Sequence, residues 1–349
     1  MTEKNKKRDQ VSAEPADAEE APTTDESMSE NVMETEIGPA VDEVVVPETL
    51  VADGLTGDEL TQQLAQTAPL TPPPTDNPIM ATIVAKAVPV KPLNLDFAYR
   101  CHIGALRGRN EDACFVLQPQ TGGQEPMPPF GLYIVADGMG GHHNGHVASR
   151  MVSRMVAGQV LERIYLPLVN ESENGPEPVQ DVLHSAVQAA NIAIFSPDPD
   201  KDMGTTLTMA LVMGNRIFLT HVGDSRAYLL VDDELTLLTT DHTLVQRLQD
   251  AGQLTAEEAE KHPHRNVLYR AVGQGGELEI DISRRPVPES GKLLLCSDGL
   301  WGLVPADVIK DTLQRADWSL DEMVEHLIQL ALAAGGHDNI TGVLIEFSR

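Results

Sequence analysis

The chain has 349 residues, and its 53 acidic side chains against 25 basic ones give a formal net charge of −28. This charge argues against a general nucleic-acid-binding protein, because contacts to phosphate need lysine and arginine. Three cysteines are too few for a disulfide framework or a thiolate zinc site, and they fit a reducing cytoplasm.

The first 93 residues have the composition of a disordered tail. They contain 18 acidic and 6 basic residues, and all 13 aromatic residues of the chain lie at or after Phe97. A segment without aromatic side chains cannot bury enough apolar surface to offset the entropy lost on ordering. We therefore expect a tail over residues 1–93, either as a solvated tether or with short apolar clusters, such as 79–84, docked on a partner or on the following domain.

No segment predicts a membrane span or a signal peptide. The best apolar run, residues 79–90, is shorter than the roughly 20 residues that a span requires, and it contains Lys86 and Pro89. The basic start of the chain is followed by an acidic stretch instead of an apolar core. These features predict a soluble, cytoplasmic protein without a membrane partner.

Residues 94–349 have the pattern of one globular domain. A short apolar run at 132–136 predicts a buried strand that ends at Asp137. Apolar residues at three- and four-residue spacing then predict amphipathic helices over 147–164 and 179–195.

The second half of the domain predicts an antiparallel meander with two late helices. Hairpin-type turns are expected at Gly214-Asn215, Gly223-Asp224 and Asp232-Asp233. Strands are expected at residues 206–213, 216–222, 227–231, 235–239, 293–296 and 342–347. With helices over 305–315 and 320–333, this pattern indicates a layered α+β domain and not an alternating parallel-sheet fold.

Acidic residues recur beside glycine or asparagine where a strand or helix is expected to end. They are Glu111-Asp112, Asp137-Gly138, Asp298-Gly299 and Asp338-Asn339. Carboxylate, carbonyl and water oxygens are the ligands that Mg²⁺ and Mn²⁺ prefer, and converging carboxylates repel one another without a cation. Each pair taken alone is also typical of a helix cap or a turn. The spacing alone therefore leaves both a metal site and simple turn residues open.

Six short motifs follow one another along residues 97–349: RGRNEDA at 107–113, VADGMGGH at 135–142, GTT at 204–206, VGDSR at 222–226, LCSDGLW at 295–301 and HDNIT at 337–341. In this order they resemble the motifs of the metal-dependent serine/threonine protein phosphatases, the type 2C or PPM family, in its bacterial form. The resemblance implies an α+β, four-layer sandwich of two antiparallel β-sheets flanked by α-helices. It also implies hydrolysis of phosphoserine and phosphothreonine in proteins, opposing a cognate serine/threonine kinase.

Carried onto this chain, the resemblance implies a centre of two Mn²⁺ or Mg²⁺ ions. Asp137 would bridge both ions, with the Gly138 carbonyl and Glu111, mainly through water, at one of them. Asp298 and Asp338 would hold the other ion. Two such ions about 3.5–4 Å apart lower the pKa of a water between them, so that hydroxide forms near neutral pH.

The same resemblance gives two residues a catalytic role. Asp112 would orient the attacking water, and Arg107 would clamp the substrate phosphate with its planar fork of donors. The hydroxide would attack phosphorus in line with the leaving oxygen, without a phosphoenzyme. Met139 stands where some family members have a histidine proposed to protonate the leaving alcohol, so water at the metal centre is the expected acid.

Other polar residues near these motifs leave alternatives. Asp200 and Asp202 straddle the position of a third-metal ligand in bacterial relatives, and a solvated acidic loop is the equal alternative. His142, His143 and His146 are expected to have a structural role at the start of a helix and not to bind metal.

Segment 244–273 resembles the bacterial flap beside the active site, and we expect it to contact the protein part of the substrate. Asp224 and Arg226 are expected to set a turn and an ion pair.

A catalytically inactive scaffold that binds phosphoproteins is the main alternative function, and a phosphatase acting on anti-sigma-factor antagonists is a narrower one. Nothing in the sequence requires more than a monomer.

Overall fold

The computed structural model describes residues 92–349, apart from 123–126, 140–143, 173–174 and 196–202. The predicted tail over 1–93 lies outside the described residues except for its last two positions, so the domain boundary stays a prediction. None of the helices in the described ranges combines the length and the apolar character needed to cross a bilayer.

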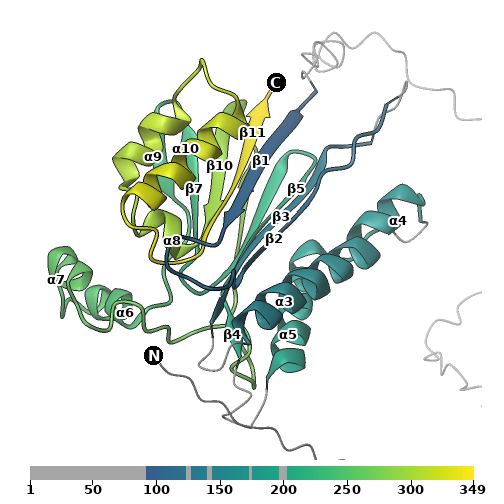
Figure 1. The fold of residues 1–349 in the computed structure, drawn as a ribbon. Coiled ribbons are helices and arrows are strands. Elements are labelled where there is room, and N and C mark those ends of the chain that lie inside the picture. The colour runs from purple at the N-terminus through teal and green to yellow at the C-terminus, as the bar shows by residue number, and fades with distance from the viewer. Residues whose placement is uncertain (1–91, 123–126, 140–143, 173–174, 196–202) are drawn as a thin grey trace, which may run out of the picture. The chain divides into compact units, whose positions relative to one another are not determined.

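Two antiparallel sheets form the centre of the fold (Figure 1). In spatial order, the strands of the first sheet are β1 (Asn94–His102), β11 (Ile340–Ser348), β10 (Ser290–Cys296), β7 (Arg226–Val231) and β8 (Glu234–Leu237). Those of the second are β2 (Asp112–Leu117), β3 (Phe130–Met139), β5 (Leu207–Met213), β6 (Arg216–Val222) and β9 (Asp281–Pro286), and the short β4 (Gly204–Thr205) pairs with β3. β1 and β2 are therefore edge strands of different sheets.

Helices cover the outer face of each sheet, which gives four layers (Figure 1). The second sheet carries α3 (Gly145–Val160), which continues through a π-helical turn at Leu161–Tyr165 into α4 (Leu166–Val169), and also α5 (Val179–Ile194). The first sheet carries α8 (Asp298–Trp301), α9 (Ala306–Leu313) and α10 (Leu320–Ala333). The short α6 (Leu244–Asp250) and α7 (Ala256–Glu260) stand off to one side of these layers.

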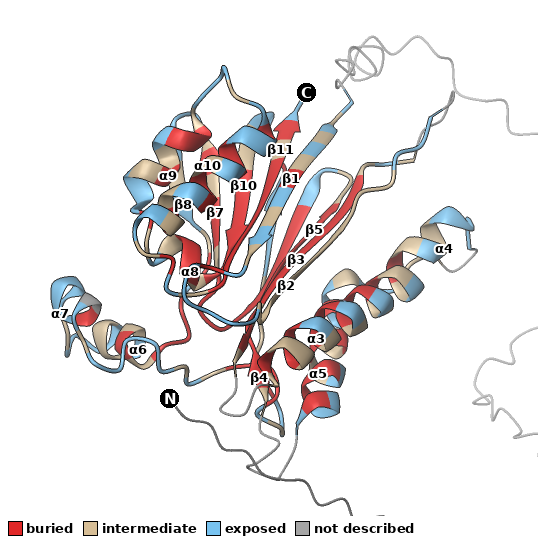
Figure 2. Ribbon diagram, viewed as in Figure 1, coloured by how far each residue is buried: buried red, intermediate tan, exposed pale blue. Residues whose placement is uncertain are grey.

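The buried residues line the interfaces between the layers (Figure 2). Along β3, Leu132 and Ile134 pack with the residues of α3 and α5, whereas Tyr133 and Val135 pack with residues of the first sheet. Successive side chains of a strand point to opposite faces. Because both faces of β3 are covered, the sequence of this strand is a continuous apolar run and does not alternate.

The predicted architecture of two antiparallel sheets flanked by helices is confirmed. The helix expected at 320–333 is α10 and the strand expected at 216–222 is β6, each with the predicted bounds. The prediction that a strand ends at Asp137 is wrong. β3 continues to Met139, because Gly138 and Met139 pair with Thr205 and Gly204 of β4.

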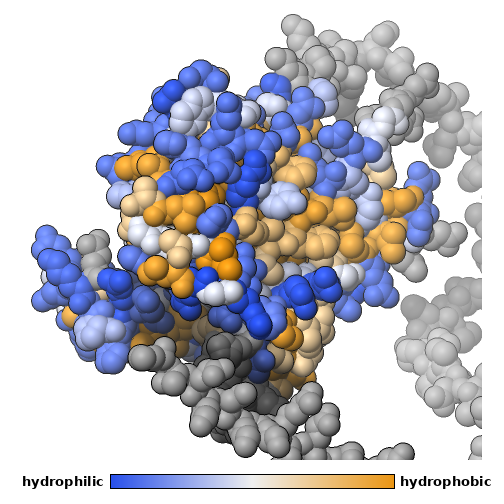
Figure 3. Space-filling model, in the orientation of Figure 1, coloured by the Kyte–Doolittle hydropathy of each residue, from blue (hydrophilic) through white to orange (hydrophobic). Residues whose placement is uncertain are grey.

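The surface in Figure 3 is mostly hydrophilic around α6, α7 and α9, and hydrophobic residues gather along the middle of the face, where β1 and β2 run in Figure 1. The part of the molecule that carries the candidate site lies at one end of the two sheets, where the turns before β11 and after β10 meet β2 and β3.

Candidate active site

Four of the predicted site carboxyls come from the ends of different elements. Asp112 and Asp137 stand opposite each other, at the first residue of β2 and near the end of β3. Asp298 is the first residue of α8, directly after β10 and Ser297. Asp338 lies in the turn that precedes β11. The fold thus brings together residues from the beginning and the end of the domain.

Two glycines allow these segments to approach one another. A Cβ atom at Gly138 would lie 2.2 Å from the carbonyl oxygen of Gly145 and 2.6 Å from that of Glu111. A Cβ atom at Gly299 would lie 2.0 Å from the carbonyl oxygen of Asn339. Since side chains do not tolerate such contacts, glycine is the only residue that fits after Asp137 and Asp298 in this backbone.

Hydrogen bonds hold the backbone of Glu111 in place. Its carbonyl oxygen accepts from the Gly138 backbone N–H at 3.1 Å and from the Ser149 hydroxyl at 2.6 Å. Its N–H donates to the side-chain oxygen of Asn339 at 2.7 Å, and the amide nitrogen of Asn339 donates to the Arg109 carbonyl at 3.0 Å. The predicted pair Asp338-Asn339 therefore contributes in two ways, with a carboxyl in the site and an amide that fixes the loop of Glu111.

The surroundings of the site carboxyls disfavour their ionised forms and raise their pKa values. Burial raises the pKa of Asp112 to about 7, the nearby hydroxyls of Thr341 and Ser297 oppose this shift, and repulsion by Asp298 and Asp338 adds to it. Burial raises the pKa of Asp298 to about 6, with repulsion by Asp338 as the next cause. The pKa of Asp137 is raised well above its usual value by burial and by the neighbouring carboxyls. Such shifts mark a cluster of acids that lacks compensating positive charge.

The oxygen donors of this cluster fit a divalent cation. Oδ1 of Asp112 and Oδ1 of Asp298 are buried without a hydrogen-bond partner, which is costly for a polar atom. Within the described ranges, no group of three or more His, Cys, Asp or Glu side chains is positioned to hold a metal ion. The fit of these residues to a divalent cation therefore rests on three points. The ligands are oxygen atoms, two of these oxygens are buried without a hydrogen-bond partner, and a cation would relieve the repulsion between the carboxylates.

Arg107 lies at the mouth of the acidic cluster. Its Nη2 is 2.5 Å from Oδ2 of Asp338, and about half of the Arg107 side chain is exposed. A guanidinium in this position brings a positive charge to Asp338 and Asp298 while it remains accessible to a ligand.

Of the other residues predicted to lie near the site, the structure describes some, and the rest lie outside the described ranges. His146 lies in the first turn of α3, as expected, and its ring is 3.2 Å from the Arg109 guanidinium. Met139 ends β3 and pairs with Gly204. The residues His142, His143, Asp200 and Asp202 lie outside the described residues.

Asp224 is a member of the acidic cluster that the sequence interpretation missed. Its side chain is buried, and burial, followed by repulsion from Asp298 and Asp241, raises its pKa to about 8. The sequence signal was present, because Asp224 also stands beside a glycine at the end of a strand. The expected ion pair is formed by Arg226, whose guanidinium contacts both carboxyl oxygens of Asp241 at 3.0 and 2.7 Å and stacks on Trp301.

A pocket of about 820 Å³ opens beside the acidic cluster. Its lining includes Asp224, Asp298 and Asp338 from the cluster, Gln246, Gln249 and Arg265 from segment 244–273, and Trp301 at the end of α8 with Leu303 just after it. The pocket is thus closed on one side by the segment predicted to be the flap, and it is large enough for several side chains of a polypeptide.

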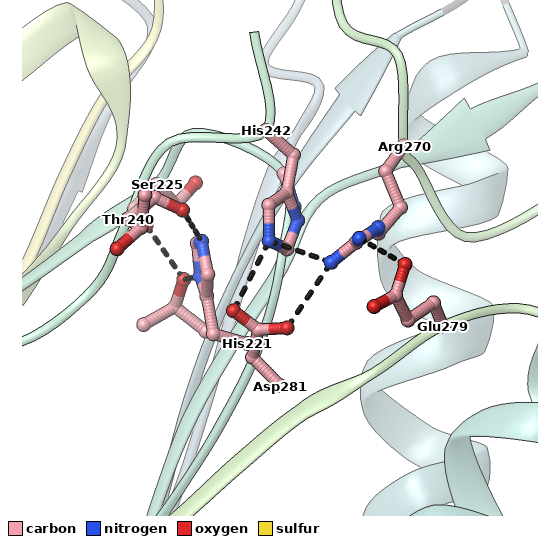
Figure 4. A network of polar contacts seen from close by, with 9 residues as sticks. His221, Ser225, Thr240, His242, Arg270, Glu279 and Asp281 are labelled. Atoms are coloured by element: carbon pink, nitrogen blue, oxygen red, sulfur yellow. Dashed lines mark hydrogen bonds and ion pairs between the residues drawn. The ribbon is translucent and has the colours of Figure 1, made fainter. Parts of the chain in front are cut away.

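Segment 244–273 is anchored near both ends by the polar network of Figure 4. Asp281 on β9 contacts His242 Nε2 at 3.3 Å and Arg270 Nη1 at 3.1 Å, and Arg270 also pairs with Glu279. Burial lowers the pKa of His242, and the charge of Arg270 lowers it further. Nδ1 of His242 accepts from the Gly223 backbone N–H at 3.0 Å, and Nε2 lies between Arg270 Nη1, at 2.9 Å, and Asp281 Oδ2, at 3.3 Å. The network ties the ends of the segment to β6 and β9, beside the turn that carries Asp224.

The chain is similar to known proteins in sequence and in fold. The family model described as "Protein phosphatase 2C" matches residues 109–341. The serine/threonine protein phosphatase PstP of Mycobacterium tuberculosis is 40% identical over 258 residues, which cover 73% of this chain but only 45% of PstP. The chain therefore spans less than half the length of that relative. The serine/threonine phosphatase stp of Listeria welshimeri is 37% identical over 253 residues, 71% of this chain and 94% of stp.

A solved structure of the PstP catalytic domain in complex with two manganese ions is also similar. It is 37% identical, with a TM-score of 0.60, and the match covers 74% of this chain and all of that one.

Proposed function

The chain belongs to the protein phosphatase 2C family, and from this premise we propose that it is a metal-dependent phosphatase that hydrolyses phosphoserine and phosphothreonine in proteins. The observation that carries the proposal is the cluster of partly buried carboxyls from different elements with raised pKa values, with an accessible arginine at its mouth. An inactive scaffold has no use for such a cluster, because uncompensated acids destabilise a fold.

We assign the metal-binding role to Glu111, Asp137, the carbonyl of Gly138, Asp298 and Asp338. A pair of Mn²⁺ or Mg²⁺ ions, when bound, acidifies water and offsets the negative charge of the phosphate oxygens. The raised pKa values of Asp137 and Asp298 support this assignment, since a cation stabilises the ionised carboxylates that burial disfavours. The two manganese ions of the PstP catalytic domain support it by similarity.

Arg107 binds the phosphate of the substrate in this proposal. In the structure its guanidinium pairs with Asp338 and remains about half exposed, so its other donors are accessible from solvent. The planar guanidinium can donate two parallel hydrogen bonds to phosphate oxygens and neutralise the charge that grows on them.

Asp112 positions the water that attacks phosphorus. Ser297 donates to its Oδ2 at 2.8 Å, which fixes the carboxyl and leaves Oδ1 without a partner. Oδ1 can therefore accept a hydrogen bond from water. Met139 offers no proton beside Asp137-Gly138, so the leaving alcohol takes its proton from water.

The pocket of about 820 Å³ would hold the polypeptide around the phosphorylated residue. Phosphoproteins are therefore the proposed substrates, and residues 244–273 the segment that contacts them. A cognate serine/threonine kinase, a monomeric state and a cytoplasmic location stay predictions, as does the division into a tail (1–93) and a phosphatase domain (94–349). Asp200 or Asp202 as the ligand of a third ion also stays a prediction.

Hydrolysis of a chromogenic aryl phosphate and of a phosphothreonine peptide tests the proposal. We expect turnover of both with Mn²⁺, and loss of turnover with EDTA or in the variant Asp137→Asn. Activity that is indifferent to both changes contradicts the metal-dependent mechanism. Binding of the phosphopeptide without hydrolysis under all metal conditions would favour the scaffold instead.

A further inference from the structure

We propose that Cys101 and Cys114 form a redox-sensitive modification site, at which a hydroperoxide joins the two β-sheets by a reversible disulfide next to Asp112. The sulfur atoms are 3.1 Å apart. A disulfide needs an S–S distance of about 2.05 Å, so closing the bond requires a movement of about 1 Å. Neither residue has a role in the proposed hydrolysis.

The two cysteines lie on edge strands of different sheets. Cys101 is near the end of β1, and Cys114 is the third residue of β2. β1 pairs with β11 and β2 pairs with β3, so no ladder hydrogen bonds link the two cysteine strands. A disulfide between them would therefore be a covalent cross-link between the sheets, at a place where side-chain contact alone now joins them.

Access and acidity favour Cys101 as the residue that reacts first. Cys101 is exposed, Cys114 is partly buried and Cys296 is fully buried. The hydrogen bond with Cys114 lowers the pKa of Cys101, whereas the same contact and burial raise that of Cys114. Exposed thiols with a lowered pKa and a second cysteine in reach are the ones that peroxides oxidise.

The chemistry balances with one hydroperoxide per disulfide. The Cys101 thiolate attacks one peroxide oxygen, the O–O bond breaks, and Cys101 becomes a sulfenic acid while the other oxygen leaves as water or an alcohol. The Cys114 sulfur then attacks the Cys101 sulfur, and the sulfenic oxygen leaves as water. The two thiols lose two electrons and the peroxide gains them. A small thiol reverses the step by exchange with the disulfide.

The site is connected to Asp112 by two short routes. Cys114 follows Asp112 by two residues on the same strand. Cys101 stands directly opposite Thr341 on β11, the Thr341 N–H donates to the Ser297 hydroxyl at 3.0 Å, and this hydroxyl donates to Asp112 Oδ2 at 2.8 Å. A shift of about 1 Å between β1 and β2 would therefore displace the carboxyl that positions water in the proposed function. Displacements of this size can lower turnover by about 100-fold.

Peptide mapping of the full chain after treatment with hydrogen peroxide tests the proposal. Trypsin cleaves after Arg100, Arg107 and Arg109, and this separates the two cysteines onto different peptides. We expect a loss of two hydrogens in the intact mass and a linked pair of peptides that contain Cys101 and Cys114, both reversed by dithiothreitol. Absence of the linked pair, or a link to Cys296 or between two chains, overturns the proposal.

The effect on activity has its own controls. We expect peroxide to lower turnover of an aryl phosphate by about tenfold or more, with recovery after dithiothreitol, in the wild type and in Cys296→Ala. The variants Cys101→Ser and Cys114→Ser should resist the treatment. A linked chain with unchanged turnover overturns the connection to Asp112. Because that readout rests on the proposed function, an inactive wild type would count against that function, while the peptide map still tests the disulfide.

Discussion

Asp137 is the residue at which the electrostatics of the site and its chemistry are most directly connected. Its pKa is raised well above the usual value by burial and by four neighbouring carboxyls. We expect Asp137→Asn to lower turnover by at least about 100-fold, because it removes the proposed bridging ligand. In EDTA the same variant should melt at a higher temperature than the wild type near pH 8, because an uncompensated charge is gone. A lower melting temperature in EDTA would contradict the repulsion argument.

The acidic cluster also predicts how stability depends on pH in the absence of metal. Asp298 and Asp112 have folded-state pKa values of about 6 and about 7, above the usual value of about 3.9. The folded state therefore binds more protons than the unfolded state between about pH 4 and pH 7, and the free energy of unfolding falls as the pH rises through this window. Thermal melts in EDTA should show this fall, and Mn²⁺ should reduce it by stabilising the ionised carboxylates. Equal slopes with and without Mn²⁺ would contradict the assignment of these acids to a metal site.

Arg107 allows a test of phosphate binding that preserves charge. Arg107→Lys keeps the positive charge and removes the planar pair of donors, and hydrogen bonds to charged groups contribute about 1.5–3 kcal/mol. We expect kcat/KM for the aryl phosphate to fall by about 10- to 100-fold, while the affinity for Mn²⁺ measured by calorimetry changes little. An equal loss of Mn²⁺ affinity would instead give Arg107 a role in organising Asp338.

At the scale of secondary structure, the sequence was most informative where burial follows a regular pattern. α10 has an apolar stripe and a capping box from Ser319 and Glu322, and its bounds were predicted correctly. β9 has the sequence DISRRP and is almost wholly exposed, so no apolar alternation identifies it. It is a strand because β6 offers it a paired edge. The extension of β3 to Met139 likewise depends on pairing with β4, a contact between segments distant in sequence.

The flap segment is the element whose role can be separated from the chemistry. Residues 244–263 include α6 and α7, and Gln246 and Gln249 line the pocket, whereas the acidic cluster lies outside the segment. Removing 244–263 should lower hydrolysis of phosphopeptides and alter the preference among them much more than it lowers turnover of an aryl phosphate. Arg270→Ala, which keeps the segment and weakens its anchor to Asp281, is a milder companion variant. Equal losses on both substrates would contradict a role in binding the polypeptide.

On the scale of the whole molecule, the site depends on contacts between distant segments that no local sequence pattern predicts. The acidic residues beside glycine or asparagine were the candidate carboxyls, and the family resemblance gave them roles. The approach of Asn339 to Gly299, and the hydrogen bond from Ser297 to Asp112, arise only when the two sheets are packed. Asp224 was assigned to a turn for the same reason, since its proximity to Asp298 depends on the contact between the β6–β7 turn and α8.

The division of the chain into a tail and a phosphatase domain can be tested by truncation. A chain that begins at Pro92 keeps all of β1, which pairs with β11 over nine residues from Asn94 to His102. We expect this chain to retain the melting temperature and the aryl phosphatase activity of the full protein, because the described core uses no residue before Leu93. A matched chain that begins at Arg100 loses Phe97 and the buried Ala98 together with two thirds of the β1–β11 pairing. It should be destabilised by several kcal/mol (about 3 or more). If the chain that begins at Pro92 is destabilised as strongly as the one that begins at Arg100, residues 1–91 are part of the folded domain and the predicted boundary is wrong.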